Sequence, residues 1–301
     1  MIDRKSKILS FDEIVDRIKE LTGLQEEEVR YRVWTEALDP GANVSFSALE
    51  FGVTPHVYNT KMENFYRSTD AFIFEIMVES CRKGKRKVMD RVRTRMKKYI
   101  EDRRASRINT LMFGDGIGLD TIFLHENFDD RVKLYYFDVP GSKTFDFACK
   151  LFKKYNIPVD ILTDIKYIPQ NFFDVVICFE VLEHLPEPLE LISGISAYLK
   201  NNGIALITES FGAVIKNFPT HLKSNLKYEN RTPFLFLKNS MILSWYPIND
   251  LPGRPMEFVK KSNLSQVDKF KYKVRLFSSK HIMFSILKRY IKQILKRFLR
   301  G

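Results

Sequence analysis

The stretch INTLMFGDGIG (residues 108–118) places a mainly apolar run directly before a loop that holds three glycines. An apolar run of this length that ends at glycine is typical of a buried β-strand. Gly114, Gly116 and Gly118 can adopt positive φ angles and let a ligand approach the backbone. The helical pattern that starts near Leu119 adds a helix N-terminus with unpaired N–H groups. The stretch therefore predicts a strand, a turn and a helix. Taken alone, the turn is either a ligand site or one of the many glycine-rich turns that only join a strand to a helix.

More strand-like runs follow this unit, separated by candidate helices. The runs lie at 132–137, 159–162, 173–179 and 204–208, and the helices at 118–126, 142–155 and 187–200. Nearly continuous apolar strands that alternate with helices predict an α/β fold, in which helices cover both faces of a parallel sheet. Farther along the chain, 241–245 and 272–277 are expected to form the last two strands.

The chain before this pattern is expected to be mainly helical. Ser10 and Glu13 have the spacing of a capping box, and a second helix is predicted to end before residues 39–41, Asp-Pro-Gly. The aromatic-rich segment 42–70 is expected to be irregular, and 71–104 to be helical with an interruption near Gly84. The predicted parts are an N-terminal helical or lid region (1–106), the α/β domain (107–278) and a basic amphipathic helix (279–301).

Cysteine content and apolar runs favour a cytoplasmic protein. Cys81, Cys149 and Cys178 are scattered, and no Cys-x-x-Cys pair occurs, which is typical of a reducing compartment. The N-terminus has no apolar run suited to a signal peptide. No run of uncharged apolar residues is long enough to span a membrane.

The positive charge of the chain is concentrated in two segments. The net charge is +12; residues 82–104 hold twelve Lys and Arg against three acids, and residues 269–301 hold eleven and no acid. Both segments are predicted to be surfaces for a partner. The helix at 279–301 has three interpretations: it packs on the domain with its charges in water, it lies on an anionic membrane surface at the inner face, or it binds nucleic acid.

The spacing of the glycine loop separates it from common phosphate-binding loops. Leu119 stands where a dinucleotide fingerprint has its third glycine, and no Lys-Ser/Thr pair follows as in a P-loop. Asp138 ends the second strand, where an acid can accept both ribose hydroxyls, and Asp164 follows the third, where an acid can accept from an adenine amino group. Each acid could also be an ordinary cap, but two acids at successive strand ends favour a ligand site.

Four blocks carry a resemblance to a known family: TLMFGDGIGLD (110–120), YYFDV (135–139), TDIKYIP (163–169) and FFDVVICFEVLEHLPEPLELISGISAYLKNNGIALITES (172–210). They resemble class I S-adenosylmethionine-dependent methyltransferases. The resemblance implies a Rossmann-like, seven-stranded, mostly parallel sheet with one antiparallel strand near an edge, and S-adenosyl-L-methionine as the cofactor.

The resemblance also implies roles for single residues. Gly114, Gly116 and Gly118 would line the methionine and ribose, Asp138 would hold the ribose, Asp164 and Ile165 the adenine, and Phe179 and Glu180 would face the sulfonium and the acceptor. The chain departs from the family at Met112, where an acid usually stands, and Asp115 is the residue that could compensate.

The acceptor is indicated by a weaker resemblance. NFYRSTDAFIFE (64–75) and PTHL (219–222) look like bacterial methyltransferases that modify glycans or small polar metabolites. This implies O-methylation, as in polysaccharide biosynthesis. A lipid-linked glycan is a hypothesis that rests on the charge and periodicity of residues 279–301, because such an acceptor would suit a membrane surface. The sequence indicates neither the oligomeric state nor the methylated position.

Two histidines are candidate general bases, because a hydroxyl acceptor must lose a proton and imidazole suits neutral pH. His184 follows the fourth strand and His221 follows the fifth, although such a histidine often only packs locally. Glu180 and Glu183 are alternative bases or orienting groups. No metal site is predicted, because no His and carboxylate cluster has ligand spacing along the chain. The aromatic residues Tyr58, Phe65 and Tyr66 form either a lid or part of the core.

Two other functions compete with this one. An RNA methyltransferase would use the basic segments, but the chain has Phe-Glu-Val-Leu (179–182) where an Asn/Asp-Pro-Pro-aromatic motif would stand. A non-catalytic binding module with the same fold is supported by Met112.

Overall fold

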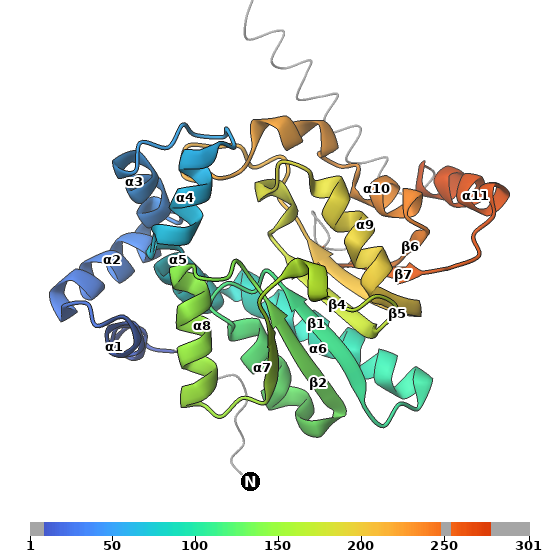
Figure 1. Cartoon of the computed structure of the whole chain (residues 1–301), viewed down its shortest axis with the longest axis horizontal. Coiled ribbons are helices and arrows are strands. Elements are labelled where there is room, and N and C mark those ends of the chain that lie inside the picture. Colours follow the sequence, from blue (N-terminus) through green and yellow to red (C-terminus); the bar gives the residue numbers. More distant parts are fainter. Residues whose placement is uncertain (1–8, 248–253, 278–301) are drawn as a thin grey trace, which may run out of the picture.

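The computed structural model describes residues 9–247 and 254–277, and these form an α/β fold around a seven-stranded sheet (Figure 1). The strand order is β3-β2-β1-β4-β5-β7-β6, and β7 runs antiparallel to both of its neighbours. The strands are β1 (Ile108–Phe113), β2 (Val132–Phe137), β3 (Val159–Leu162), β4 (Phe173–Phe179), β5 (Leu199–Thr208), β6 (Met241–Trp245) and β7 (Met256–Lys260). The predicted fold class is confirmed.

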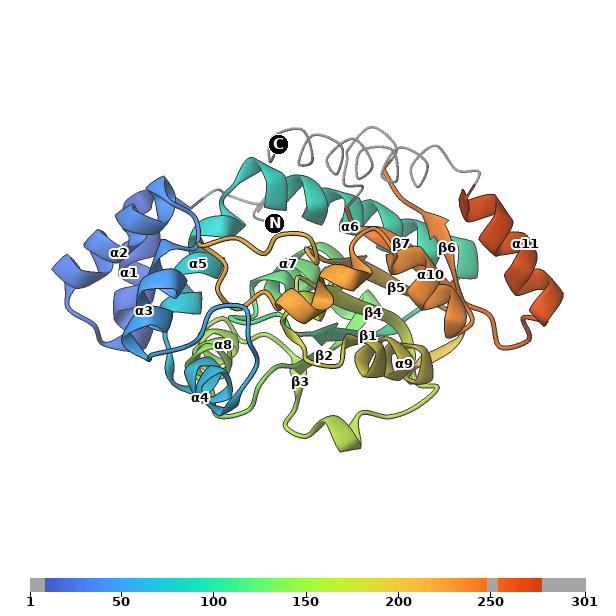
Figure 2. The same cartoon turned by 90° about the horizontal axis from the view of Figure 1, so that it is seen from above.

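Helices cover both faces of this sheet because the central strands are apolar on both sides (Figure 2). Alternate residues of β1 and β4 pack with α6 (Lys83–Arg103) and α7 (Leu119–Phe128). The intervening residues of the same strands pack with α9 (Pro188–Tyr198) and α10 (Thr232–Lys238). Strand β1 pairs in parallel with β2 on one side and with β4 on the other. The glycine loop after β1 therefore lies at the carboxyl ends of the central strands.

The N-terminal region is more regular than expected. Its helices are α1 (Phe11–Thr22), α2 (Glu26–Leu38), α3 (Ala42–Glu50), α4 (Thr60–Ser68) and α5 (Ala71–Ser80). The capping box of Ser10 and Glu13 is confirmed. The prediction of an irregular segment 42–70 is wrong, since Gly41 in the left-handed conformation starts α3 and the Asn59 side chain caps α4.

These helices join the α/β domain through α5. Apolar residues of α1, α2 and α5 form a common core with Ile117 of the glycine loop and with α8 (Lys143–Lys154). The short 3-10 turns are η1 (Asp129–Arg131), η2 (Ile165–Tyr167), η3 (Leu182–His184) and η4 (Lys223–Tyr228).

The end of the described chain corrects one predicted strand. The strand at 241–245 is confirmed as β6, but 272–277 belongs to helix α11 (Gln266–Phe277). Ser265 and Asp268 accept each other's backbone N–H groups and fix the start of this helix, which outweighs the alternating pattern after it. The strand that completes the sheet is β7. The sequence does not predict it, because Glu257 interrupts its apolar pattern.

Glu257 is buried because a cation on the opposite element neutralises it. Its two carboxylate oxygens accept from Arg95 Nε at 2.7 Å and from Arg95 Nη2 at 2.8 Å, and Ser244 Oγ donates to the same carboxylate. Arg95 lies on α6, so this bidentate pair ties the helix to the sheet.

Several cations of the basic segment 82–104 are used inside the fold. Besides Arg95, Lys85 pairs with Asp120 at 2.5 Å, and Arg91 and Arg103 donate to backbone carbonyls. This segment therefore stabilises the packing of α6 as well as carrying charge. The predicted helix at 279–301 lies outside the described residues. Within them, no helix combines the length and the apolar character needed to cross a bilayer.

Candidate functional site

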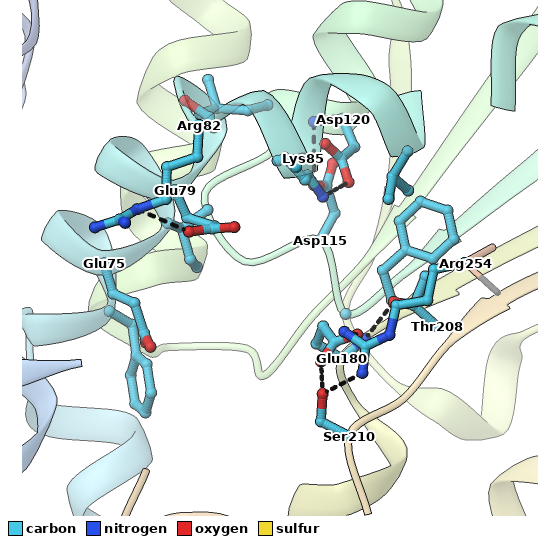
Figure 3. Close-up of a pocket in the computed structure, with 18 of the residues that line it drawn as sticks. Glu75, Glu79, Arg82, Lys85, Asp115, Asp120, Glu180, Thr208, Ser210 and Arg254 are labelled. Atoms are coloured by element: carbon cyan, nitrogen blue, oxygen red, sulfur yellow. Dashed lines mark hydrogen bonds and ion pairs between the residues drawn. The ribbon is translucent and has the colours of Figure 1, made fainter. Parts of the chain in front are cut away.

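A cavity of about 580 Å³ lies at the carboxyl ends of the central strands (Figure 3). Gly114 follows β1, Glu180 follows β4 and Ser210 follows β5, and all three line the cavity. Residues of α5 and α6, among them Glu75 and Lys85, form the opposite wall. The strand order reverses beside β1, and ligands of open α/β sheets bind outside the strand ends at such a switch point. The volume is within the range of ligand sites.

The three glycines of the loop have different surroundings. Gly114 lines the cavity with φ of 74°, and a side chain there would collide with Val181. A side chain at Gly116 would collide with Ile76 of α5, and one at Gly118 with Phe152 of α8. Of the three loop glycines, Gly114 is the one among the described residues that line the cavity, and it lets Val181 pack against the loop. Gly116 and Gly118 allow α5 and α8 to pack closely.

The two predicted cofactor acids lie at successive strand ends, but neither is among the described residues that line the cavity. Asp138 accepts from the N–H of Gly116 and of Val139, both at 2.7 Å, and burial raises the pKa of its carboxyl. Asp164 accepts from Lys166 N at 2.8 Å and caps η2, and the neighbouring Ile165 is exposed. Their roles toward ribose and adenine remain predictions.

Asp115 lines the cavity, but its carboxylate is engaged by the start of α7. One oxygen accepts from the N–H and the hydroxyl of Thr121, at 2.7 and 2.6 Å, and the other from Asp120 N at 3.2 Å. Burial, with the nearby carboxylate of Asp120, raises the pKa of Asp115 to about 8. Asp115 therefore acts first as a helix cap, and its use as a substitute for an acid at Met112 would compete with these bonds.

The structure brings His184 and His221 together at the cavity. Their rings are perpendicular, with centroids 4.7 Å apart, and both residues line the cavity. His184 Nδ1 lies 2.9 Å from Tyr66 Oη and 3.3 Å from the carbonyl oxygen of Thr220. Burial lowers the pKa of His184 to about 4; burial and the neighbouring His184 lower that of His221 to about 3. Both imidazoles are therefore neutral at pH 7 and able to accept a proton.

Glu183 lies beside these histidines and is fully buried. Both of its carboxylate oxygens and His221 Nδ1 are buried and have no hydrogen-bond partner among the described residues. Burial and the nearby Glu180 raise the pKa of Glu183 well above its usual value. Candidate ligand atoms of Glu183, His184 and His221 all lie within 4.8 Å of one another, a donor set that could hold a divalent metal. The prediction of no metal site rests on the absence of ligand spacing in the sequence. The fold brings these three residues together from separate segments, so that reason does not hold.

Glu180 is held in a strained position at the end of β4. Its φ angle is 52°, which is uncommon for a residue other than glycine. Its carboxylate forms an ion pair with Arg254 at 3.1 Å and accepts from Ser210 Oγ. Burial raises the pKa of this carboxyl, but Arg254 and Ser210 outweigh burial, so the pKa is lowered. Arg254 belongs to no motif that the sequence could reveal.

Two of the proposed lid aromatics have clear places. Phe65 is fully buried in the N-terminal core, and Tyr66 stacks on Phe72 and reaches His184 through its hydroxyl. Tyr58 is 40% exposed and is not among the described cavity-lining residues. Tyr66 is therefore the contact between these helices and the histidine pair.

Comparison with known proteins gives the class. Residues 82–257 match the family described as "Methyltransferase domain", so the chain belongs to this family. The described cavity suits the family's cofactor by its place, because Gly114 of the glycine loop lines it and the carboxyl ends of β1, β4 and β5 converge there. The protein is an S-adenosylmethionine-dependent methyltransferase.

Individual relatives are more distant. A ubiquinone biosynthesis O-methyltransferase of Actinobacillus pleuropneumoniae serotype 5b (strain L20) is 32% identical over 98 residues, which are 28% of this chain and 38% of that protein. The chain thus spans well under half of this relative. Haemonchus contortus phosphoethanolamine N-methyltransferase 2, solved with S-adenosylhomocysteine, has a TM-score of 0.37 at 20% identity, over 46% of this chain and 34% of that one. The O-methyltransferase region of StiE, residues 961–1257, has a TM-score of 0.47 at 17% identity, over 67% and 82%.

Proposed function

We propose that this methyltransferase transfers the methyl group to a hydroxyl of a glycan or another small polar acceptor. The observation that carries the proposal is the pair of neutral imidazoles, His184 and His221, that lines the cavity beside Glu180. A hydroxyl must lose its proton as it attacks the methyl group, and a neutral histidine in the cavity can take that proton.

His184 is the proposed base. A proton on Nδ1 would be shared by two oxygens within reach, Tyr66 Oη and the carbonyl of Thr220, and this leaves the Nε2 lone pair free. Burial keeps the phenol of Tyr66 neutral, because it raises the pKa of that group. His221 stands against the ring of His184 and is proposed to orient it or the acceptor. The bound cofactor supplies the electrophilic methyl group.

The test is the variant His184→Gln. We expect kcat to fall by about 10² to 10⁴, the usual contribution of a general base, while the dissociation constant of S-adenosylhomocysteine stays unchanged. His125→Gln is the matched control, because His125 lies on α7 and is not among the described cavity-lining residues. Full activity of His184→Gln on a hydroxyl acceptor would reject the role of His184.

The acceptor class needs its own assay. The name of the Actinobacillus relative supports oxygen rather than nitrogen as the methylated atom. Release of S-adenosylhomocysteine should be measured with a panel of sugars, lipid-linked glycans, amines and RNA. We expect turnover with hydroxyl-bearing polar acceptors, and turnover confined to RNA would favour the rival function.

A location at the inner face of a membrane is part of this proposal. It rests on the positive charge and helical periodicity of residues 279–301. Flotation with vesicles that contain anionic lipid should bring the full chain to the top of the gradient, and deletion of 280–301 should abolish this. Equal flotation of both proteins would reject the membrane contact.

A further inference from the structure

The carboxylates that line the cavity differ in whether they have a partner. Most are engaged: Glu36 accepts from the backbone of Gly41 and Asn43, Glu79 pairs with Arg82 at 3.0 Å, Asp120 with Lys85, Glu180 with Arg254, and Asp115 caps α7. Glu75 lines the same cavity, and within residues 9–247 and 254–277 no hydrogen bond or ion pair satisfies it. A carboxylate in this position lacks a donor that a ligand could supply.

Glu75 lies close to the glycine loop because of how α5 packs. The next residue, Ile76, occupies the space that a side chain at Gly116 would need, so α5 rests directly on the loop. Glu75 and Gly114 both line the cavity. Figure 3 shows Glu75 and Glu79 on one side of the cavity and Glu180 with Arg254 on the other.

The charges around Glu75 favour a positive ligand. Burial and the carboxylates of Glu36, Glu79 and Glu180 raise the pKa of Glu75 to about 8. Four cations of the described chain line the cavity: Arg82, Lys85 and Arg254 each pair with another acid, and Arg91 donates to the carbonyl oxygen of Arg254. A positively charged group that enters the cavity would therefore find its strongest unmet attraction at Glu75.

We propose that Glu75 accepts the ammonium group at the methionine end of S-adenosylmethionine. In the cofactor a short carbon chain joins that ammonium to the sulfonium, whose methyl group must reach an acceptor in this cavity. The ammonium must then lie in the cavity too. The position two residues before Gly114 is Met112, a buried thioether in the cavity wall that cannot pair with a cation. This inference rests on the cofactor and does not depend on the acceptor.

The experiment is calorimetric titration with S-adenosylhomocysteine, which keeps the ammonium and is stable. We expect Glu75→Gln to weaken binding by about 10- to 100-fold, the usual range for a lost hydrogen bond to a charged group. A deaminated analogue should bind wild type and Glu75→Gln with equal, weak affinity, because the two changes remove the same interaction. Glu50→Gln on α3 is the control, since Glu50 is exposed and should leave binding unchanged.

A proton measurement gives a second readout. The ammonium favours the ionised carboxylate, so binding at pH 7 should release protons from Glu75, seen as a dependence of the binding enthalpy on the ionisation enthalpy of the buffer. Glu75→Gln should lose this component. Glu36 on α2, Glu79 on α5, Arg82 at the start of α6 and Glu180 after β4 surround Glu75 and are present in both proteins.

Three outcomes decide the proposal. Unchanged affinity of Glu75→Gln for S-adenosylhomocysteine overturns it, even if turnover of an amine-bearing acceptor falls, because Glu75 would then bind the acceptor's amine instead. Equal affinity of wild type for the deaminated analogue and for S-adenosylhomocysteine also overturns it. This measurement uses the wild-type protein alone, so it does not depend on whether a variant folds. The role of His184 is tested by turnover, and the role of Glu75 is tested by the affinity for S-adenosylhomocysteine. Either proposal can therefore be rejected without affecting the other.

Discussion

The two walls of the cavity come from very different parts of the sequence. The strand wall is built from the ends of β4 and β5 and carries Glu180, His184 and His221. The helix wall is built from α5 and α6 and carries Glu75, Glu79 and Lys85. Residues of the strand wall follow apolar strands in a recognisable order, whereas those of the helix wall lie within ordinary helices. The comparison shows that site residues at strand ends can be predicted from the local sequence. The charged residues of the helix wall cannot, because their position depends on how α5 and α6 pack.

The largest effect is expected where the helix wall is tied to the sheet. Arg95→Met leaves Glu257 buried without its cation and should lower the free energy of unfolding by about 3 to 5 kcal/mol. The double variant Arg95→Met, Glu257→Met should recover most of this loss. Urea denaturation measures both, and equal losses in the two variants would mean that the unpaired Glu257 carboxylate is not the cause of the lower stability.

The loop between the two walls should tolerate no side chain at its first glycine. Gly114→Ala combines a left-handed φ with a collision at Val181, and we expect the affinity for S-adenosylhomocysteine to fall by about 10- to 100-fold. Adding Val181→Ala should restore part of the affinity, because it removes the collision and keeps the strain. Calorimetry measures both, and wild-type affinity in Gly114→Ala would contradict this account.

The strand wall should also show itself in the pH dependence of stability. The unfolded chain binds protons to histidine near pH 6.5, whereas the folded chain binds them to His184 only near pH 4. The stability due to this residue is therefore present above pH 6.5 and is lost as the pH falls toward 4. Denaturation of wild type and His184→Gln should give a stability difference that varies over this window. The difference is the useful quantity, because Glu75 and Asp115, whose pKa values are raised to about 8, act in the opposite direction. A constant difference would rule out a buried, neutral His184.

The smallest effect is expected where the N-terminal helices touch the strand wall. Tyr66→Phe removes the hydroxyl that lies 2.9 Å from His184 Nδ1 and should cost about 1 kcal/mol, or about fivefold in kcat. The shift should appear in kcat rather than in the affinity for S-adenosylhomocysteine. An unchanged kcat would mean that the carbonyl of Thr220 orients His184 without help.

The sequence predicts most of the sheet and the strand wall. The first five strands and β6 follow from apolar runs, and His184 and His221 follow from their places after β4 and β5. Strand β7 escapes because Glu257 looks like a surface residue until Arg95 is placed beside it. The sequence does not reveal Glu183 as a candidate metal ligand, because His221, the other candidate ligand beside it, lies on a separate loop.

The glycine loop shows a different limit of prediction. A glycine needed for ligand approach and one needed for helix packing look the same in sequence. Gly116 and Gly118 belong to the second kind, as their neighbours Ile76 and Phe152 show. Residue spacing carries no information about which helix will arrive at the loop, so Glu75 on α5 could not be foreseen either.

The contact of Ile76 with Gly116 has a consequence for how the protein can be divided. The segment that matches the methyltransferase family begins at residue 82, after α5 has ended. A fragment trimmed to that segment would keep the β4 and β5 ends but lose Glu75, Glu79 and the covering of the glycine loop. Its cofactor site would be an open groove in contact with water. The helices before residue 82 are therefore an integral part of the enzyme's site.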